Sequence, residues 1–206
     1  MKEAFTPSAT NAGEVKDALV IADGSCQKIR SLLQGAKADV AWIEPERGRS
    51  LEAITEALES RRDSNLPANT LHLVAHGSKD TIRIGNNILT EQELKKNSNN
   101  LKKWNLTTIA LWCCETGQNK IFVKSLEELT DAKIYASKNK LGRIEDCSNW
   151  SLTSDTRKEI CDIPFNEKIL EDWPYQLDDI ENESNTTNPA APVITDITDA
   201  AADPDA

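Results

Sequence analysis

The chain has 206 residues, of which 38% are hydrophobic, and its formal net charge is −10. This length is sufficient for one domain with a sizeable core. No apolar run approaches the length needed to cross a bilayer, so membrane insertion is not expected. Eight of the 34 acidic residues lie in residues 177–206, which contain no Lys or Arg, so the remaining chain is nearly neutral. It has no basic stripe with interleaved aromatic residues, and nucleic acid is not an expected partner.

The two ends of the chain have the composition of unstructured segments. Residues 1–17 are expected to form a flexible leader, and they lack the apolar core of a secretory signal. Residues 178–206 are acidic and rich in Asn, Thr and Ala, which indicates a disordered linker toward a downstream repeat. The stretch Ala191–Asp199 is typical of the first strand of such a repeat. The domain is therefore expected at 18–177. Its localisation stays open, since secretion or display at the cell surface would need another route of export.

Between these ends, short apolar runs alternate with helical patterns. The runs that predict strands, with the turn residues that follow some of them, are 18–23, 40–43, 70–78, 107–117 and 133–137. The helical patterns cover 25–35, with Ser25 as the cap, 50–62, 90–101 and 116–129, and a hairpin is expected at 82–89. Beyond them, a short strand is expected at 149–153 and a closing helix or ordered extension at 165–177. This order predicts an α/β fold, a three-layer α-β-α sandwich with a mostly parallel central sheet.

Two of the predicted strands end in residues of the types that carry out catalysis. The third delivers His76 and Gly77 at its carboxyl end, and the fourth delivers Cys113 and Cys114. If the strands are parallel neighbours, these groups emerge at one edge of the sheet, where open α/β sheets bind ligands. Histidine and cysteine brought together in this way form a nucleophilic site.

The candidate catalytic residues are His76, Gly77 and Cys114. His76 would serve as general base and acid, and the Gly77 amide, with no Cβ in the way, could approach a carbonyl oxygen. Cys114 would attack a peptide carbonyl, with its own amide and that of Gly77 forming an oxyanion hole. The alternative is a strand-end histidine that hydrogen-bonds nearby backbone and is followed by an ordinary turn glycine.

The residues beside Cys114 bear on this assignment. Successive strand residues point to opposite faces, so only one of Cys113 and Cys114 can face His76. Cys114 lies nearer the sheet edge and is the preferred nucleophile, with Cys113 as a packing residue. Glu115 is the strongest argument against catalysis, because a neighbouring carboxylate raises a thiol pKa unless it points away to solvent.

No metal ion and no cofactor are expected. His72 and His76 on one strand would be separated by roughly 13 Å, too far to share a metal ion, so His72 is interpreted as a core residue. The segment after the first strand has one glycine, too few for a phosphate-binding loop. The five cysteines include no C-x-x-C pair and are expected to be mostly free thiols, with a Cys147–Cys161 disulfide if the protein is exported.

An ordered set of motifs resembles a bacterial domain of unknown function, the DUF4347 type. The motifs are His72–Ser78, Ile84–Thr90, Leu111–Cys114, Ala136–Ser137 and Asn149–Leu152. The resemblance implies a place at the N-terminus of a very long surface or secreted repeat protein. The Gly-Cys-Asn typical of that domain is here Cys113-Cys114-Glu115, so both neighbours of the cysteine differ from the pattern.

The His-Gly pair and the strand-end cysteine are also similar to the caspase-like cysteine peptidases, which include gingipains and clostripain, although the caspase-specific pentapeptide is absent. This resemblance implies a caspase-like fold and a cysteine endopeptidase that acts on a peptide or protein substrate, its own longer chain included. It places substrate-binding candidates at Ser137 and at Asp146, whose carboxylate could bind a basic side chain. The alternative is a non-catalytic adhesion or assembly module that retains the fold.

Overall fold

The centre of the molecule is a parallel five-stranded sheet. The computed structural model describes residues 17–43, 49–144, 147–154 and 161–178. The sheet has the order β2-β1-β3-β7-β8, and every neighbouring pair is parallel. Its strands are β1 (Ala18–Asp23), β2 (Asp39–Ile43), β3 (Thr70–Val74), β7 (Thr108–Trp112) and β8 (Lys133–Ala136). All six residues of β1 are buried, as expected for a strand covered on both faces.

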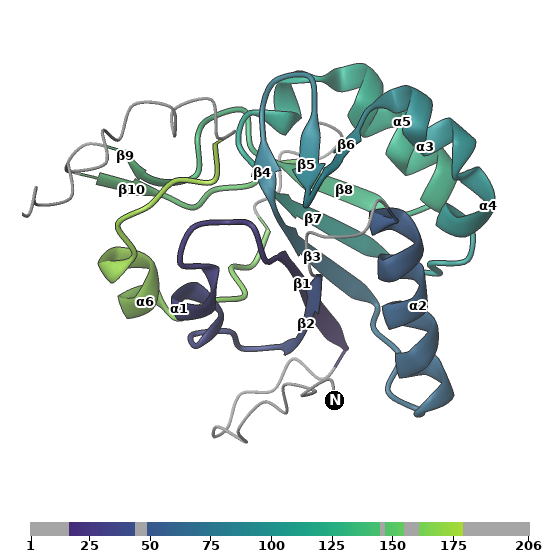
Figure 1. Ribbon diagram of the computed structural model, residues 1–206, viewed down its shortest axis with the longest axis horizontal. Coiled ribbons are helices and arrows are strands. Elements are labelled where there is room, and N and C mark those ends of the chain that lie inside the picture. Colours follow the sequence, from purple (N-terminus) through teal and green to yellow (C-terminus); the bar gives the residue numbers. More distant parts are fainter. Residues whose placement is uncertain (1–16, 44–48, 145–146, 155–160, 179–206) are drawn as a thin grey trace, which may run out of the picture.

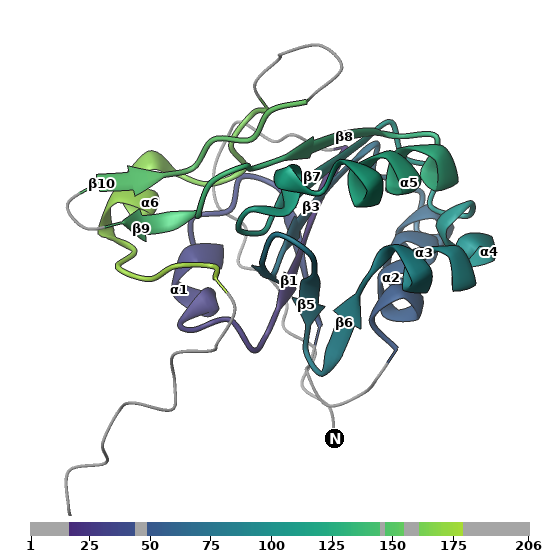
Figure 2. The same cartoon turned by 90° about the horizontal axis from the view of Figure 1, so that it is seen from above.

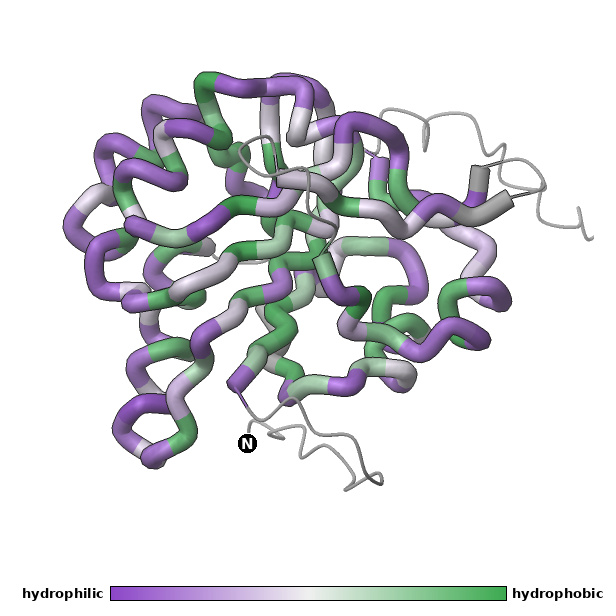
Figure 3. Tube along the Cα trace, turned by 180° about the vertical axis from the view of Figure 1, so that it is seen from behind, coloured by the Kyte–Doolittle hydropathy of each residue, from purple (hydrophilic) through white to green (hydrophobic). Residues whose placement is uncertain are grey.

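Helices cover both faces of this sheet (Figures 1 and 2). One face carries α2 (Ser50–Asp63), α3 (Glu91–Lys96), α4 (Ser98–Leu101) and α5 (Lys120–Thr130), and the other carries α1 (Ile29–Leu33) and α6 (Glu167–Asp172). Alternate strand residues supply two separate cores, so Leu71 and Leu73 pack toward the first face while Val74 packs toward the second. In Figure 3 the hydrophobic segments gather on the central strands and the hydrophilic ones on the outer turns of the helices. The mixed α/β prediction with a mostly parallel central sheet is confirmed.

The predicted strand at 70–78 divides at Ala75. Its last part is β4 (His76–Gly77), which leaves the large sheet and pairs with β5 (Ile82–Ile84), itself paired with β6 (Asn87–Leu89). The turn between β5 and β6 is held by the buried Asp23 carboxylate, which accepts a hydrogen bond from the Gly85 amide at 2.9 Å. The hairpin was expected from the sequence. His76 belongs to the small three-stranded sheet β4-β5-β6 and not to the large sheet.

Local hydrogen bonds shift two predicted helix starts. Ser25 donates its amide and its hydroxyl to the Asp23 carboxylate, at 2.9 and 2.6 Å, so it closes a turn and α1 begins only at Ile29. The predicted helix at 116–129 begins as a short 3₁₀ turn, Thr116–Gln118, and α5 then starts behind an Asn119 cap, whose side chain accepts from the Phe122 amide. The Thr90 cap of α3 is found as predicted, with its hydroxyl accepting from the Glu93 amide at 3.3 Å.

The last part of the fold differs most from expectation. The strand expected at 149–153 is replaced by a hairpin of β9 (Gly142–Ile144) and β10 (Cys147–Asn149). Thr153 forms only a single bridge with Ala136. In the closing extension, Trp173 is packed down and 2% exposed. Among the described helices, none has both the length and the apolar character for a bilayer crossing. Apart from Asp17 and Asp178, the expected leader and linker lie outside the described residues.

Candidate functional site

His76 lies just beyond the carboxyl end of β3 and is 4% exposed. Its Nδ1 is 2.6 Å from the carbonyl oxygen of Asp178. Because a carbonyl oxygen can only accept, Nδ1 carries the hydrogen, and in the neutral ring Nε2 carries the lone pair. Nε2 is buried, with no hydrogen-bond partner among the described residues. The imidazole is therefore held at one nitrogen and has the other available to accept a proton.

Cys113 and Cys114 directly follow β7, and both are fully buried. They lie on opposite faces of the sheet, as the alternation predicts. Cys113 packs in the core beneath α5, with its Sγ 3.9 Å from the Leu73 carbonyl oxygen. Cys114 packs on the α1 and α6 side, where the Leu141 amide donates a hydrogen bond to its Sγ at 3.1 Å.

Gly77 brings the histidine and cysteine segments into contact. A Cβ built on Gly77 would lie 2.7 Å from the Cys113 Cβ and 2.7 Å from both the amide nitrogen and the carbonyl oxygen of Cys114. Only glycine allows backbone to approach backbone this closely. The residues singled out from the sequence thus meet at one end of the sheet, beside the place between β1 and β3 where the strand order reverses.

The site is closed by the chain's own residues Tyr175–Asp178, here called the covering segment. The Gly77 amide donates to the Leu177 carbonyl at 3.0 Å, and the Leu177 amide donates to the Leu141 carbonyl, also at 3.0 Å. His76 bonds Asp178, as described. The yellow-green end of the chain passes from α6 toward β4 to make these contacts (Figure 1). Among the described residues no hydrogen bond joins the His76 ring to the Cys114 sulfur. The ring bonds the Asp178 carbonyl, whereas the sulfur bonds the Leu141 main chain and lies in the same buried cluster as Leu177.

Burial dominates the electrostatics of Cys114. The pKa of the Cys114 thiol is raised to about 12, chiefly by burial and also by the Asp178 carboxylate, while the amides of Leu141 and Leu177 and the Lys140 ammonium act to lower it. Glu115, which was expected to perturb this thiol, is not among the groups that shift its pKa, and its carboxylate accepts from the Gln118 side chain at 3.3 Å. The acidic group that acts on Cys114 is Asp178, far away in sequence.

A third cysteine reaches the same end of the sheet. Cys26 follows β1, is 3% exposed, and lies close to the His76 amide. Burial and then the Asp23 carboxylate raise the pKa of its thiol. Sequence reasoning did not assign Cys26 or Asp23 to the site, although both follow an apolar run in the same way as the two residues it did assign.

A family model described as "Domain of unknown function (DUF4347)" matches residues 19–177. The match includes His76, Gly77 and Cys114 and ends within the covering segment. The chain belongs to the DUF4347 family. No curated protein and no solved structure matches it.

The two predicted substrate-binding residues of this DUF4347 domain have different outcomes. Ser137 is 2% exposed, its hydroxyl accepts from the Asn139 amide at 3.1 Å, and its carbonyl accepts from the Gly117 amide at 2.8 Å. It therefore shapes the loop that leads to Leu141, which is a wall of the site. Asp146 lies outside the described residues.

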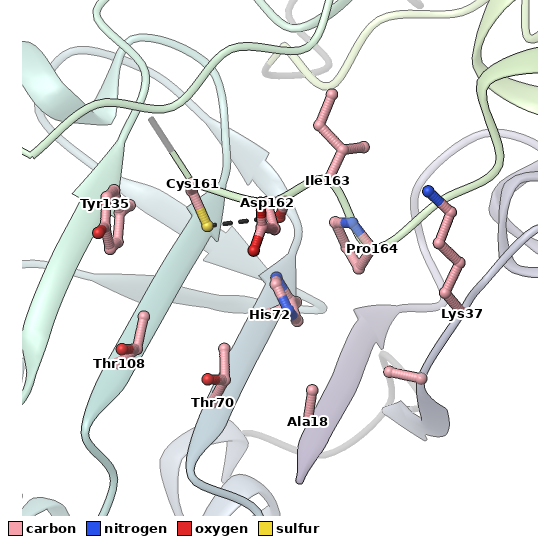
Figure 4. Close-up of a pocket in the computed structure, with 11 residues that line it drawn as sticks. Ala18, Lys37, Thr70, His72, Thr108, Tyr135, Cys161, Asp162, Ile163 and Pro164 are labelled. Carbon is pink, nitrogen blue, oxygen red and sulfur yellow. Dashed lines mark hydrogen bonds between the residues drawn. The ribbon is translucent and has the colours of Figure 1, made fainter. Parts of the chain in front are cut away.

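His72 faces a separate hollow of about 230 Å³ on the α1 and α6 side of the sheet (Figure 4). Its Nδ1 accepts a hydrogen bond from the Trp112 indole at 3.1 Å, and burial lowers the pKa of His72 to about 4, against a smaller opposing effect of Asp162. Above it, Cys161 is a free thiol whose Sγ is 3.5 Å from the Asp162 carbonyl oxygen, so it is not in the disulfide considered from the sequence. In the described part of the chain no cluster of three or more His, Cys, Asp or Glu side chains could hold a metal ion.

Proposed function

We propose that this DUF4347 domain is a cysteine peptidase module of the caspase-like kind, with Cys114 as nucleophile and His76 as proton carrier. The observation that carries the proposal is that groups from two separate strands lie beside one extended stretch, Leu177–Asp178: the His76 imidazole bonds the Asp178 carbonyl, and Cys114 lies in the same buried cluster as Leu177. A peptide held in that position is within reach of both groups.

The proposed reaction uses groups already present. His76 Nε2, the nitrogen with the free lone pair, takes the proton of the Cys114 thiol. The thiolate attacks the peptide carbonyl carbon, and the oxyanion is stabilised by the amides of Gly77 and Cys114. The imidazolium then gives its proton to the departing amine, and water hydrolyses the acyl-enzyme.

The substrate class that we propose is a peptide or protein in extended conformation, the longer chain of which this domain is part included. As part of the same proposal, the domain lies at the front of a surface or secreted repeat protein and processes it. The raised pKa of Cys114 belongs to the closed site. The thiol needs contact with water or with His76 Nε2 before it can ionise, so the active state has the covering segment displaced.

The test is a peptide electrophile that labels thiols, applied to matched variants. Cys114→Ala is expected to abolish both labelling at the site and peptide cleavage, whereas Cys113→Ala retains both, because Cys113 lies on the other face of the sheet. His76→Ala is expected to lower the rate by about 10²-fold or more, the usual contribution of a general base. Equal labelling of the two cysteine variants would show that Cys114 is not the nucleophile.

A second candidate is a non-catalytic adhesion or assembly module. The observation that favours it is that Cys114 is fully buried and its pKa is raised, as for a small core residue. If a broad peptide library remains uncleaved after the covering segment has been released, with the fold intact, this candidate replaces the peptidase.

A further inference from the structure

The covering segment is bound in the manner of an added β-strand. It forms a parallel bridge between Asp178 and Gly77 on one side and an antiparallel bridge between Gln176 and Gly142 on the other. The Arg143 amide donates to the Tyr175 carbonyl at 2.8 Å, in addition to the two Leu177 hydrogen bonds already described. These contacts use main-chain atoms, which every peptide has, and strand addition is a common way to bind extended peptides.

Glycine allows the close approach on the second side. Gly142 has a φ of +102°, and a Cβ there would collide with the Tyr175 carbonyl and lie 2.9 Å from the Gln176 Cα. The covering segment therefore lies between Gly77 and Gly142, in a position here called the slot, and at both glycines the absence of a Cβ lets another main chain come close. A slot built in this way selects a main chain in extended form before it selects any side chain.

The two innermost side chains give the slot its preference. Leu177 is fully buried in the same core as Cys114 and Leu141. Asp178 follows, and its carboxylate forms an ion pair with the Lys140 ammonium at 3.0 Å, at the rim of the site. An apolar position is therefore followed by one that favours negative charge.

We infer that the covering segment is a built-in peptide ligand of the His76/Cys114 site, and that the same slot takes an extended peptide with a large apolar residue followed by an acidic one. The inference rests on the proposed function, in which His76 and Cys114 form the catalytic site. The segment engages the Gly77 amide, which the reaction uses for the oxyanion, the Nδ1 of the catalytic His76 ring, and the surroundings of the Cys114 sulfur. The domain is consequently inactive until the end of the covering segment at Asp178 detaches from the site.

The first test disrupts the ion pair between Lys140 and Asp178 and measures the alkylation rate of each cysteine separately. Asp178→Lys and, independently, Lys140→Glu replace the ion pair with like charges. The alkylation rate of Cys114, followed by peptide mapping with mass spectrometry, is expected to rise on the order of tenfold in either variant. Lys140→Asp combined with Asp178→Lys restores the pair in reverse and returns the rate to near that of the parent chain.

Cys113 and Cys161 are internal references, because Cys113 lies in the core on the other face of the sheet and Cys161 lines the separate hollow around His72. Lys138→Glu makes the same charge change on the same loop without touching the Asp178 pair, and it is expected to leave the Cys114 rate unchanged. A rise shared equally by all three thiols would mean general loosening of the fold and would overturn the inference. So would an unchanged Cys114 rate in both single variants.

The second test supplies the ligand from outside. A fluorescent peptide with the sequence of residues 174–180 is expected to bind the 206-residue Asp178→Lys variant saturably, by fluorescence anisotropy, and the parent chain at least tenfold more weakly. The same peptide with Leu177→Asp is expected not to bind. Binding of this peptide together with no cleavage of any peptide in the library test would keep the inference and remove the peptidase. Cleavage of library peptides that depends on Cys114, without binding of this peptide, would remove the inference alone.

Discussion

Glu115, like Lys28, has a backbone conformation that does not suit its residue type. It has a φ of +57°, in the left-handed region, where the Cβ of an ordinary residue approaches the following carbonyl oxygen. Asn tolerates this region better than Glu does. The residue at this position is therefore a matter of backbone strain, while the carboxylate that raises the pKa of the Cys114 thiol is that of Asp178.

Replacing Glu115 with Asn should stabilise the domain. We expect Glu115→Asn to raise the free energy of unfolding by about 1 kcal/mol, because part of the left-handed cost is removed. Urea denaturation followed by circular dichroism measures the change. Asp131→Asn is the control, since Asp131 also has a positive φ, of 55°, and Asp already tolerates it, so its effect is expected within about 0.5 kcal/mol. A destabilised Glu115→Asn variant would show that the Glu115 side chain contributes more than the strain costs.

At the scale of elements, the approach of β4 to the segment after β7 decides whether the site exists. Gly77→Ala would force a methyl group against Cys114 backbone atoms, which cannot move without shifting the end of β7. We expect a loss of about 2 kcal/mol or more in the free energy of unfolding, measured by urea titration, and faster alkylation of Cys114 as the two segments separate.

Gly35→Ala is the matched control for this variant. A Cβ on Gly35 would come within 2.7 Å of the Ile169 Cγ1 and 2.8 Å of the Ile169 Cβ, so relief there needs a shift of α6, a six-residue helix with mostly exposed residues, rather than of the central sheet. Its cost should therefore be clearly smaller. Equal costs at the two glycines would show that the backbone contact at Gly77 adjusts freely.

The elements show what sequence patterns can and cannot specify. The five strands of the large sheet were predictable because each contains a short apolar run, which depends on local composition, and the central ones, such as β1, are buried throughout. The division at Ala75 was not, because it depends on the hairpin that Asp23 holds through Gly85, a contact between residues 62 positions apart. Ser25 failed as a cap for a similar reason, since the Asp23 carboxylate bound it first.

The candidate site divides in the same way. His76, Gly77 and Cys114 could be proposed from residue types at strand ends, and parallel pairing of β3 with β7 then brings the two segments together. The covering segment could not be anticipated. Its bond to His76 joins residues 102 positions apart, and its main-chain contacts leave no pattern of side chains to detect. Cys26 was missed because its thiol lies against backbone of another strand.

At the scale of the whole molecule, His72 couples global stability to pH. The folded domain holds its pKa at about 4, below the ordinary value of 6.5, because burial disfavours the charged ring. Between these two values the unfolded chain binds the proton and the folded chain does not. Stability from this group is therefore complete above pH 6.5 and is lost as the pH falls toward 4.

The predicted loss from His72 over this window is on the order of 3 kcal/mol. His72→Asn keeps a polar group near the Trp112 indole and does not titrate. We expect the difference in unfolding free energy between parent and variant to shrink or reverse as the pH falls from 7.5 to 4, measured by urea titration at each pH. Carboxylates titrate in both chains and cancel in the difference. A difference that stays constant with pH would contradict the burial of neutral His72.

The order in which the chain is made has a consequence for the covering segment. Phe165, Trp173 and Leu177, which complete the core on the α1 and α6 side, are among the last residues of the domain to be synthesised. A domain generally folds as a unit, so the core on this side of the sheet cannot close until residue 178 has left the ribosome. Until then the nascent chain carries Cys114 without its cover, open to water and to oxidants.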